Sequence, residues 1–371
     1  MMDVTRLSNN PIVETSSRLG SIVNHPSLIE VPSWVDDPLG NYYLYFSHKY
    51  GDYIRLAYAD ELSGEWTIYD PGTLHVEDTP FVGHIASPDV HVDHEREVIR
   101  LYYHGETRVR DLIARDGIDR PYRSEHYHYS PWWMPYHVAF ETGRRVFNRF
   151  ERVRRNSGST DDQSAKNKSG EGTDTQTSRD EPSKLKNVLR GLVPIPPAVQ
   201  ETRYTESRDG IHFEKSSQIL GPSWMAVFEY YGRVYGLGRD GYLYVSDVVS
   251  EPFTRKRKLF DDHRHFGVHV TDDHLDVFYS RPKDQPEQIV CAQIELSSNV
   301  DKWEVNSPVT VLRPEMDYEG ADIGVEQTRH RTPSQRRMEL RDPDIFVEKD
   351  KKYLCYTAGG ESAIAIASLD E

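Results

Sequence analysis

The chain has 371 residues, of which 37% are hydrophobic and 28% are charged, and its formal net charge is −15. No apolar run approaches the length of a membrane span and the first residues contain no hydrophobic signal segment, so we expect neither a membrane nor a secreted protein. Residues 108–200 hold 17 basic and 12 acidic side chains, whereas the rest of the chain holds 28 and 48, so we expect no nucleic-acid partner for the acidic part.

The two cysteines, Cys291 and Cys355, lie inside segments whose composition is typical of strands. Two such thiols predict buried, free cysteines in a reducing compartment rather than a disulfide framework. We therefore expect the protein to be cytoplasmic.

Five stretches of the chain resemble one another. In each, a short strand begins at a polar or aromatic residue, a second strand rich in aromatics follows, and a third strand ends near serine or aspartate. The first strands begin at His25-Pro26-Ser27, Ser87-Pro88-Asp89, Trp224-Met225-Ala226, Arg264-His265-Phe266 and Asp342-Pro343-Asp344. The second strands are predicted at Tyr42–Ser47, Ile99–His104, Arg233–Leu237, Leu275–Ser280 and Tyr353–Thr357. Such repetition is typical of a radial repeat, so we predict an all-β, five-bladed β-propeller.

Each repeat continues into further strands. Third strands are predicted at Ile54–Ala59, Thr202–Ser207, Leu243–Ser246, Ile289–Leu296 and Ala363–Ser368. Fourth strands are predicted at Trp66–Tyr69, His212–Lys215, Phe253–Lys256 and Trp303–Asn306. The fifth repeat has no fourth strand, so we expect the N-terminal segment Pro11–Arg18 to supply it and to close the ring without an open edge. The alternative is an open β-sandwich with a helical insert.

Residues 108–200 interrupt the second blade between its second and third strands, within a single propeller domain that spans 1–371. An aromatic run and an arginine-rich helical pattern occupy 108–155, residues 156–183 have a composition typical of disorder, and a short helix is predicted within 184–200. This partly helical, partly disordered insertion would serve as a flap on the blade, as a lid or substrate subsite, or as a basic helix resting on a membrane or another protein.

Three kinds of position share one face of a propeller, because strand direction alternates within each blade. They are the start of each first strand, the turn after each second strand and the linker between blades. Acids on this face are candidates for glycosidic chemistry, which needs one protonated and one ionised carboxyl group roughly 5–10 Å apart. The catalytic candidates are Asp89, Asp342, Glu319 and Glu361.

Other side chains on the same face are candidates for binding a substrate. Histidines suit sugar hydroxyls or a metal ion, although no spacing here matches a dedicated zinc motif, and Trp224 could stack on a sugar ring. The substrate-binding candidates are His25, His48, His84, Trp224, His265, Arg281, Arg341 and Asp322. We expect no required cofactor and no dedicated metal ligands, and we leave open a structural divalent ion in the channel.

Two segments of the first blade, Asn24–Ile29 and Tyr42–Ser47, resemble the opening blade of glycoside hydrolase family 43 and its five-bladed relatives. His84–Val90 resembles the segment that carries the second conserved acid of that family, and Arg341-Asp342-Pro343 resembles a motif of the related families 32 and 68. The resemblance covers nearly the whole chain except residues 108–200. It implies a five-bladed propeller that hydrolyses glycosidic bonds at the mouth of its channel.

The sequence departs from the family pattern at the catalytic acids. His25 stands where family 43 has the aspartate that acts as general base. Glu319-Gly320 is not followed by the proline that comes after the general-acid glutamate and its glycine in that family. Asp89 carries over as the acid that tunes a pKa and orients the sugar. We hypothesise that Asp342 replaces the missing base and that Glu319 or Glu361 donates the proton.

Two other functions remain open at this stage. A glycoside phosphorylase would hold inorganic phosphate with a cationic cluster of Arg264, His265, Arg281 and Arg341. A carbohydrate-binding propeller without activity would explain why His25 stands at the position of the usual base. In each case the expected partner is a carbohydrate.

Overall fold

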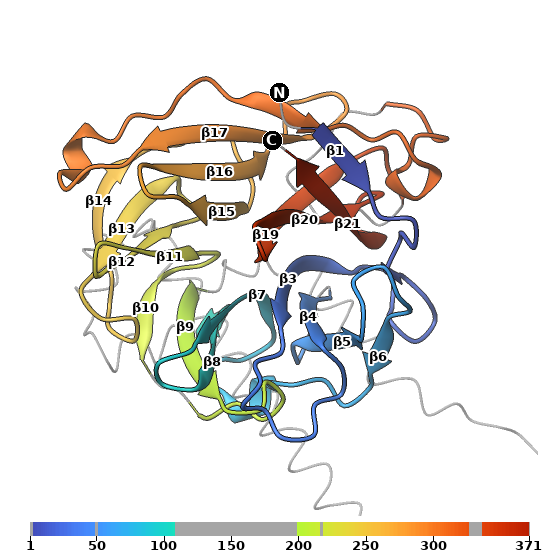
Figure 1. The fold of residues 1–371 in the computed structure, drawn as a ribbon, viewed down its shortest axis with the longest axis horizontal. Helices are drawn as coiled ribbons and strands as arrows, with labels where there is room; N and C mark the ends of the chain where they lie inside the picture. The colour runs from blue at the N-terminus through green and yellow to red at the C-terminus, as the bar shows by residue number, and fades with distance from the viewer. Residues whose placement is uncertain (1–2, 49–50, 108–198, 216–217, 326–335, 371) are drawn as a thin grey trace, which may run out of the picture. The chain divides into compact units, whose positions relative to one another are not determined.

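The computed structural model describes residues 3–48, 51–107, 199–215, 218–325 and 336–370. These residues form five antiparallel sheets, each a blade whose innermost strand faces a common centre (Figure 1). The predicted all-β, five-bladed propeller is therefore confirmed. The helices and the disorder predicted within 108–200 lie outside the described residues, apart from the last positions, where the third strand of blade two begins at Val199.

In blades one to four the strands follow chain order from the centre outwards. Blade one contains β3 (Asn24–Glu30), β4 (Tyr42–Ser47), β5 (Arg55–Ala59) and β6 (Thr67–Tyr69). Blade two contains β7 (Ile85–Asp93), β8 (Val98–Thr107), β9 (Val199–Ser207) and β10 (Ile219–Pro222). Blade three contains β11 (Ala226–Tyr230), β12 (Arg233–Leu237), β13 (Tyr242–Ser246) and β14 (Thr254–Lys258). Blade four contains β15 (Phe266–Val270), β16 (His274–Ser280), β17 (Ile289–Glu295) and β18 (Val309–Leu312).

Blade five joins the two ends of the described chain. It contains β19 (Leu340–Glu348), β20 (Lys351–Ala358) and β21 (Ala363–Asp370), and β21 pairs with β1 (Asp3–Arg6) and β2 (Val13–Glu14). Closure by an N-terminal strand is thus confirmed, and the predicted segment Pro11–Arg18 supplies β2, whereas the longer closing strand β1 precedes that segment. Asn10 bonds through its side chain to both backbone groups of Ile366, so the chain loops between two short strands instead of forming one.

Two predicted fourth strands were wrong in position. In blade two, the Asp209 carboxylate accepts hydrogen bonds from the backbone of Ile211 and His212, and this turn delays the strand until β10. In blade four, Asn299 caps a short 3₁₀ turn at Val300–Lys302, and the strand follows only at β18. Both shifts come from local side-chain hydrogen bonds that compete with strand pairing.

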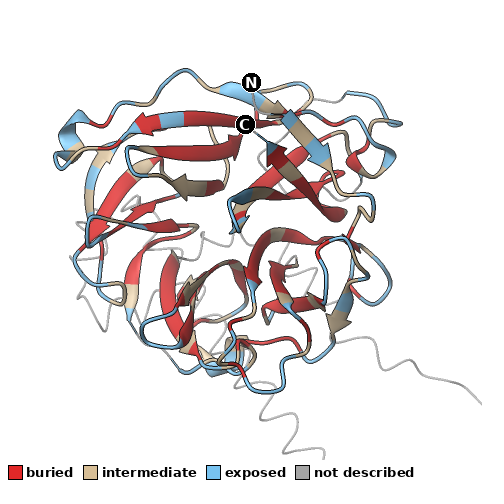
Figure 2. Cartoon of the chain, viewed as in Figure 1, coloured by how far each residue is buried: buried red, intermediate tan, exposed pale blue. Residues whose placement is uncertain are grey.

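The apolar core lies between neighbouring blades, where the aromatic second strands pack (Figure 2). Trp303 is fully buried between blades three and four, with its ring centroid 5.0 Å from that of Tyr235. Burying roughly 150–250 Å² of such a side chain at about 25 cal/mol per Å² contributes on the order of 4–6 kcal/mol. Among the described residues, no helix is both long and apolar enough to cross a membrane.

Candidate active site at the channel mouth

Four blades begin with a non-glycine residue in the left-handed backbone region, a conformation that costs about 1–2 kcal/mol. These residues are His25 (φ 51°), Ser87 (φ 50°), Trp224 (φ 59°) and Asp342 (φ 47°). Strand pairing is interrupted by a register shift directly after three of them. Strain that recurs at the same place in different blades must be held by the surrounding packing, which fixes where these side chains point.

The register shift changes which residues correspond between blades. Ser87, not Asp89, is the blade-two counterpart of His25 and Asp342, because all three have positive φ before the strand resumes. Asp89 lies two residues further along β7 and corresponds to Asp344 in β19. Asp89 and Asp342, both catalytic candidates, therefore occupy different positions in their blades.

Side chains from blades one, three, four and five meet at the channel. His265 Nδ1 lies 2.7 Å from Asp342 Oδ1 and 2.9 Å from His25 Nε2. The indole of Trp224 packs on the His265 ring with 4.1 Å between centroids, and its Nε1 donates a hydrogen bond to His104 Nε2 at 2.8 Å. The structure thus brings together four residues that the sequence singled out. His104 joins them from the end of β8 without having been selected.

The cavity inside this ring is small. It has a volume of about 40 Å³ and is lined by the first residues of all five blades, including Ser87, Trp224 and Asp342. One to three water molecules occupy such a volume, since one water needs at least roughly 10–15 Å³ of this kind of space. A sugar ring therefore does not fit within it, and a carbohydrate would have to bind above the ring, at the channel mouth.

A buried cluster of charged side chains lies next to this ring. Arg341 is 1% exposed, and its guanidinium forms ion pairs with Glu361 Oε1 at 2.9 Å, with Glu287 Oε2 at 3.2 Å and with Glu339. Glu287 also accepts a hydrogen bond from Arg264 Nε at 2.6 Å. The pKa of Arg341 is raised, because the three carboxylates outweigh the cost of its burial. Both arginines are therefore engaged by glutamates.

Glu361 and Asp342 differ in protonation within this cluster. Burial raises the pKa of Glu361 to about 7, although the neighbouring Arg341 opposes the shift. Burial also penalises the Asp342 carboxylate, but its pKa is held below the usual range by His25, His265 and Arg341. Near neutral pH Glu361, bonded to Arg341, is therefore partly protonated while Asp342 is ionised, and acid–base chemistry requires such a difference.

A second layer of polar residues ties the blades together below the ring. Asp89 Oδ2 accepts a hydrogen bond from the backbone N–H of Val227 at 2.7 Å, and Asp344 Oδ2 accepts one from that of Leu28 at 3.0 Å. Each carboxylate thus holds the innermost strand of the next blade. Burial and the charge of Asp89 raise the pKa of Asp344 to about 7. Asp344 was not named as a candidate from the sequence. Its signal was present, because Asp89 and Asp344 are the third residues of the similar motifs Ser-Pro-Asp and Asp-Pro-Asp.

The remaining candidates lie away from the ring contacts. Glu319 bonds to Arg6 and Tyr356, and Asp322 pairs with Arg336. The other pairs are Arg281 with Asp284 at 2.8 Å and His84 with Glu106 at 3.4 Å, while the His48 ring lies 5.2 Å from that of Tyr53. A catalytic role for Glu319 and substrate-binding roles for this group stay predictions.

The contribution of His48 and His263 to the stability of the fold should rise with pH between about 4 and 6.5. Burial and the nearby Arg55 lower the pKa of His48 to about 4, with Asp52 opposing, and burial lowers that of His263 to about 4. In this window the unfolded chain binds protons that the folded protein does not, so stability is lost as the pH falls. Glu361 and Asp344 act in the opposite direction because their pKa values are raised.

Urea unfolding at several pH values measures this dependence. His48→Gln should flatten the rise, and a His48→Gln protein with the full wild-type slope would contradict the assignment.

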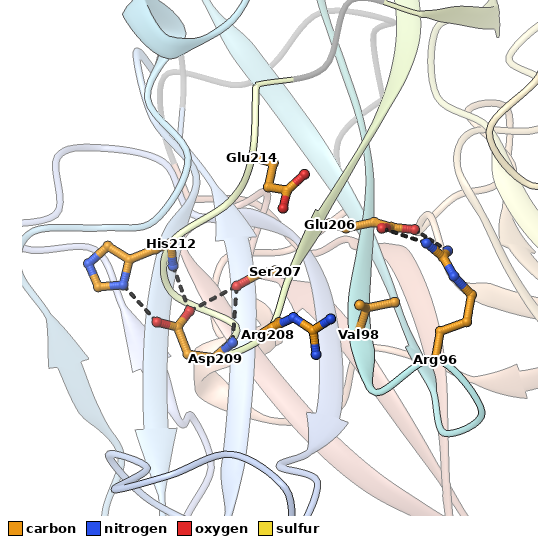
Figure 3. A pocket seen from close by; sticks show the side chains of 8 residues that line it. All are labelled: Arg96, Val98, Glu206, Ser207, Arg208, Asp209, His212 and Glu214. Atoms are coloured by element: carbon orange, nitrogen blue, oxygen red, sulfur yellow. Dashed lines mark hydrogen bonds and ion pairs between the residues drawn. The ribbon is translucent and has the colours of Figure 1, made fainter.

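Larger hollows lie on the outer part of blade two (Figure 3). One has a volume of about 490 Å³ and lies where the β7–β8 turn meets the loop after β9. Arg96 forms an ion pair with Glu206 there, and Asp209 accepts hydrogen bonds from Ser207 and His212. These charges already serve the turns that carry them, so the candidate site stays at the channel mouth.

Comparisons with known proteins agree with this architecture. No family model matches the chain. Candidate glycoside hydrolases from Parabacteroides distasonis and Bacteroides ovatus are similar in structure, with TM-scores of 0.56 and 0.55 at 10% and 11% identity. Both alignments cover 100% of this chain, and they cover 96% and 97% of the two other proteins, respectively. The fold is therefore that of the five-bladed propellers found among glycoside hydrolases.

One relative in sequence spans almost the whole chain. The uncharacterized protein R118 of Acanthamoeba polyphaga mimivirus is 25% identical over 408 aligned positions, which cover 99% of this chain and 90% of the viral protein. The match shows a related chain of similar extent, and it adds no functional assignment.

Proposed function

We propose that the protein cleaves a glycosidic bond at the channel mouth, with Glu361 as proton donor and Asp342 as the ionised partner. The observation that carries the proposal is the difference between two buried carboxyl groups: the pKa of Glu361, which is bonded to Arg341, is raised to about 7, whereas that of Asp342 is held below the usual range. Two acids with unequal protonation are what glycosidic cleavage uses. The propeller fold shared with glycoside hydrolases supports the same reading.

The substrate is a carbohydrate in this proposal, and it binds above the ring. The His25 and His265 side chains are 12% and 13% exposed, so a part of each ring is accessible to a ligand. Glu361 would give its proton to the leaving-group oxygen as the glycosidic bond breaks. Asp342 would act as base toward the attacking water or as the nucleophile.

The direct test replaces the proton donor. Glu361→Gln should lower kcat/KM by roughly 10²–10⁴ on an active member of a broad aryl glycoside and oligosaccharide panel, because the amide donates no proton to the leaving group. Aryl glycosides with acidic leaving groups should lose less, since these groups leave without protonation. The control is Glu229→Gln, an exposed glutamate near the end of β11 that pairs with Arg100.

Two outcomes separate catalysis from folding. A folded Glu361→Gln protein with wild-type activity rejects Glu361 as the donor. An equal loss on all leaving groups, together with a lowered melting temperature, indicates that Glu361 serves structure instead.

The phosphorylase alternative would need cations that are free to hold phosphate. Arg341 is surrounded by three glutamates, Arg264 bonds to Glu287, and Arg281 pairs with Asp284. These ion pairs favour hydrolysis over phosphorolysis. Turnover that depends on inorganic phosphate would reverse this preference.

A carbohydrate-binding propeller without activity is a second candidate, favoured by the first residues of blades one and two. His25 and Ser87 place an imidazole and a hydroxyl where the blades begin, and neither supplies a carboxylate. Binding of glycans by calorimetry without turnover on the whole panel would support this function over hydrolysis.

The proposal also places the protein in the cytoplasm and in carbohydrate metabolism. Cys291 and Cys355 are both buried free thiols, which supports a reducing compartment. Fractionation of the native host cells with compartment markers tests the location.

A further inference from the structure

Three side chains from different blades point metal-binding atoms at one spot in the channel. They are His25 of blade one, His265 at the start of blade four and Asp342 of blade five, whose ligand atoms all lie within 4.8 Å of one another. His265 Nδ1 is 2.9 Å from His25 Nε2 and 2.7 Å from Asp342 Oδ1, and the third side of the triangle is 3.6 Å. The three blades thus converge on a single point.

This triangle has the size of one face of a metal coordination sphere. Nitrogen and oxygen ligands about 2.1 Å from one ion lie about 3.0 Å apart at right angles and about 3.4 Å apart in a tetrahedron. The observed sides of 2.7, 2.9 and 3.6 Å bracket these values. Only small adjustments of the three side chains would therefore bring an ion to bonding distance from all of them.

The hydrogen bonds within the described residues leave this group incompletely satisfied. Asp342 is 3% exposed, and its Oδ2 has no hydrogen-bond partner among the described residues. His25 Nδ1 and His265 Nε2 also have no partner there, but they are not the ring nitrogens that face the triangle, so Asp342 Oδ2 is the atom that points to a ligand. A buried carboxylate oxygen without a partner is rare, and a bound ion or water is a usual reason for it. The adjoining cavity of about 40 Å³ has room for an ion with one or two waters.

We propose that His25, His265 and Asp342 bind one divalent first-row transition metal ion, of the zinc or manganese type, inside the channel. Two imidazoles and one carboxylate are ligands that such ions prefer, whereas Ca²⁺ takes six to eight oxygen ligands. Trp224, packed on the His265 ring, holds that ligand in place. The ion would join blades one, four and five at their inner ends. An ion here would engage the Asp342 carboxylate that the proposed hydrolysis uses as base or nucleophile, and the two proposals are tested separately because binding is measured without turnover.

The test uses full-length, tag-free protein freed of metal by chelation and then dialysed. Calorimetry with Zn²⁺, Mn²⁺ and Ca²⁺ should show a binding event of one ion per chain for a first-row metal, with Ca²⁺ much weaker. His265→Gln and His25→Gln should each weaken that event by at least ~100-fold, since loss of an indirect partner alone costs 10–100-fold. The matched control is His274→Gln, which changes a half-buried histidine that pairs with Asp273 on the far side of blade four.

A second measurement does not depend on the variants. Co²⁺ added to the metal-free wild type should give visible absorption bands of a site with nitrogen ligands, and Zn²⁺ should remove them. The proposal is overturned if the wild type binds no stoichiometric first-row ion, if Ca²⁺ binds as tightly as Zn²⁺, or if folded His265→Gln retains the event. A His274→Gln protein that loses the event equally would also overturn it.

Discussion

Arg341→Met should lower the free energy of unfolding by about 3–5 kcal/mol, or prevent folding altogether. The guanidinium is 1% exposed and balances three buried carboxylates, those of Glu287, Glu339 and Glu361. Removing one partner of a buried ion pair leaves charge without compensation, which costs that much in measured cases. Methionine has a similar length, so little of the loss would come from an unfilled volume. Urea unfolding at pH 7 measures the effect.

The matched control for this variant is Arg233→Met. Arg233 pairs with Asp247 at 2.8 Å, but both side chains are about half exposed or more, at 47% and 79%. Exposed pairs contribute roughly 0–1 kcal/mol, so this change should be small. If Arg341→Met and Arg233→Met were equally mild, the cluster would not be an important source of stability.

Glu319→Gln should destabilise the ring closure by about 3 kcal/mol. This value is at the upper end for a hydrogen bond to a charged group and at the lower end for breaking a buried ion pair. Glu319 is fully buried, and its two oxygens accept bonds from Arg6 Nε at 2.8 Å and Nη2 at 2.9 Å. It also accepts hydrogen bonds from Tyr356 OH and the backbone N–H of Glu315. Because Arg6 belongs to β1, the glutamate fastens the closing strand to blade five.

Hydrogen exchange resolves this prediction by strand. The amides of β1 should exchange faster in Glu319→Gln, while those of blades two and three change little. Glu315→Gln is the matched control, since Glu315 contacts the same Arg6 from a position that is 67% exposed. Loss of glycosidase activity with unchanged exchange in β1 would instead support the catalytic role predicted for Glu319.

Much of the fold could be predicted from the sequence, because the aromatic second strands recur at regular intervals. The prediction for β4 at Tyr42–Ser47 matches the structure at both ends, as does that for β12 at Arg233–Leu237. The fourth strands of blades two and four were misplaced. Their positions depend on Asp209 and Asn299, whose side chains close local turns, and short polar segments carry little periodicity that reveals such turns.

The site could be predicted in part. His25, Trp224, His265 and Asp342 meet as expected, because all of them lie near the start of a first strand. Asp89, grouped with Asp342 as a catalytic candidate, lies instead in the layer of Asp344. A positive φ before a register shift decides the layer, and a residue other than glycine gives no sequence signal for that conformation.

Ring closure by β1 sets an order of events during synthesis. Asp3 pairs with Asp370, so the first strand of the described chain must wait for one of the last residues. At ~5–20 residues per second, that wait is roughly 20–75 s on the ribosome. During this time blade five has no outer strand, and the Arg6–Glu319 ion pair is not yet held in place by the pairing of β1 with β21. In a nascent chain β1 is therefore exposed to aberrant strand pairing until β21 has been synthesised.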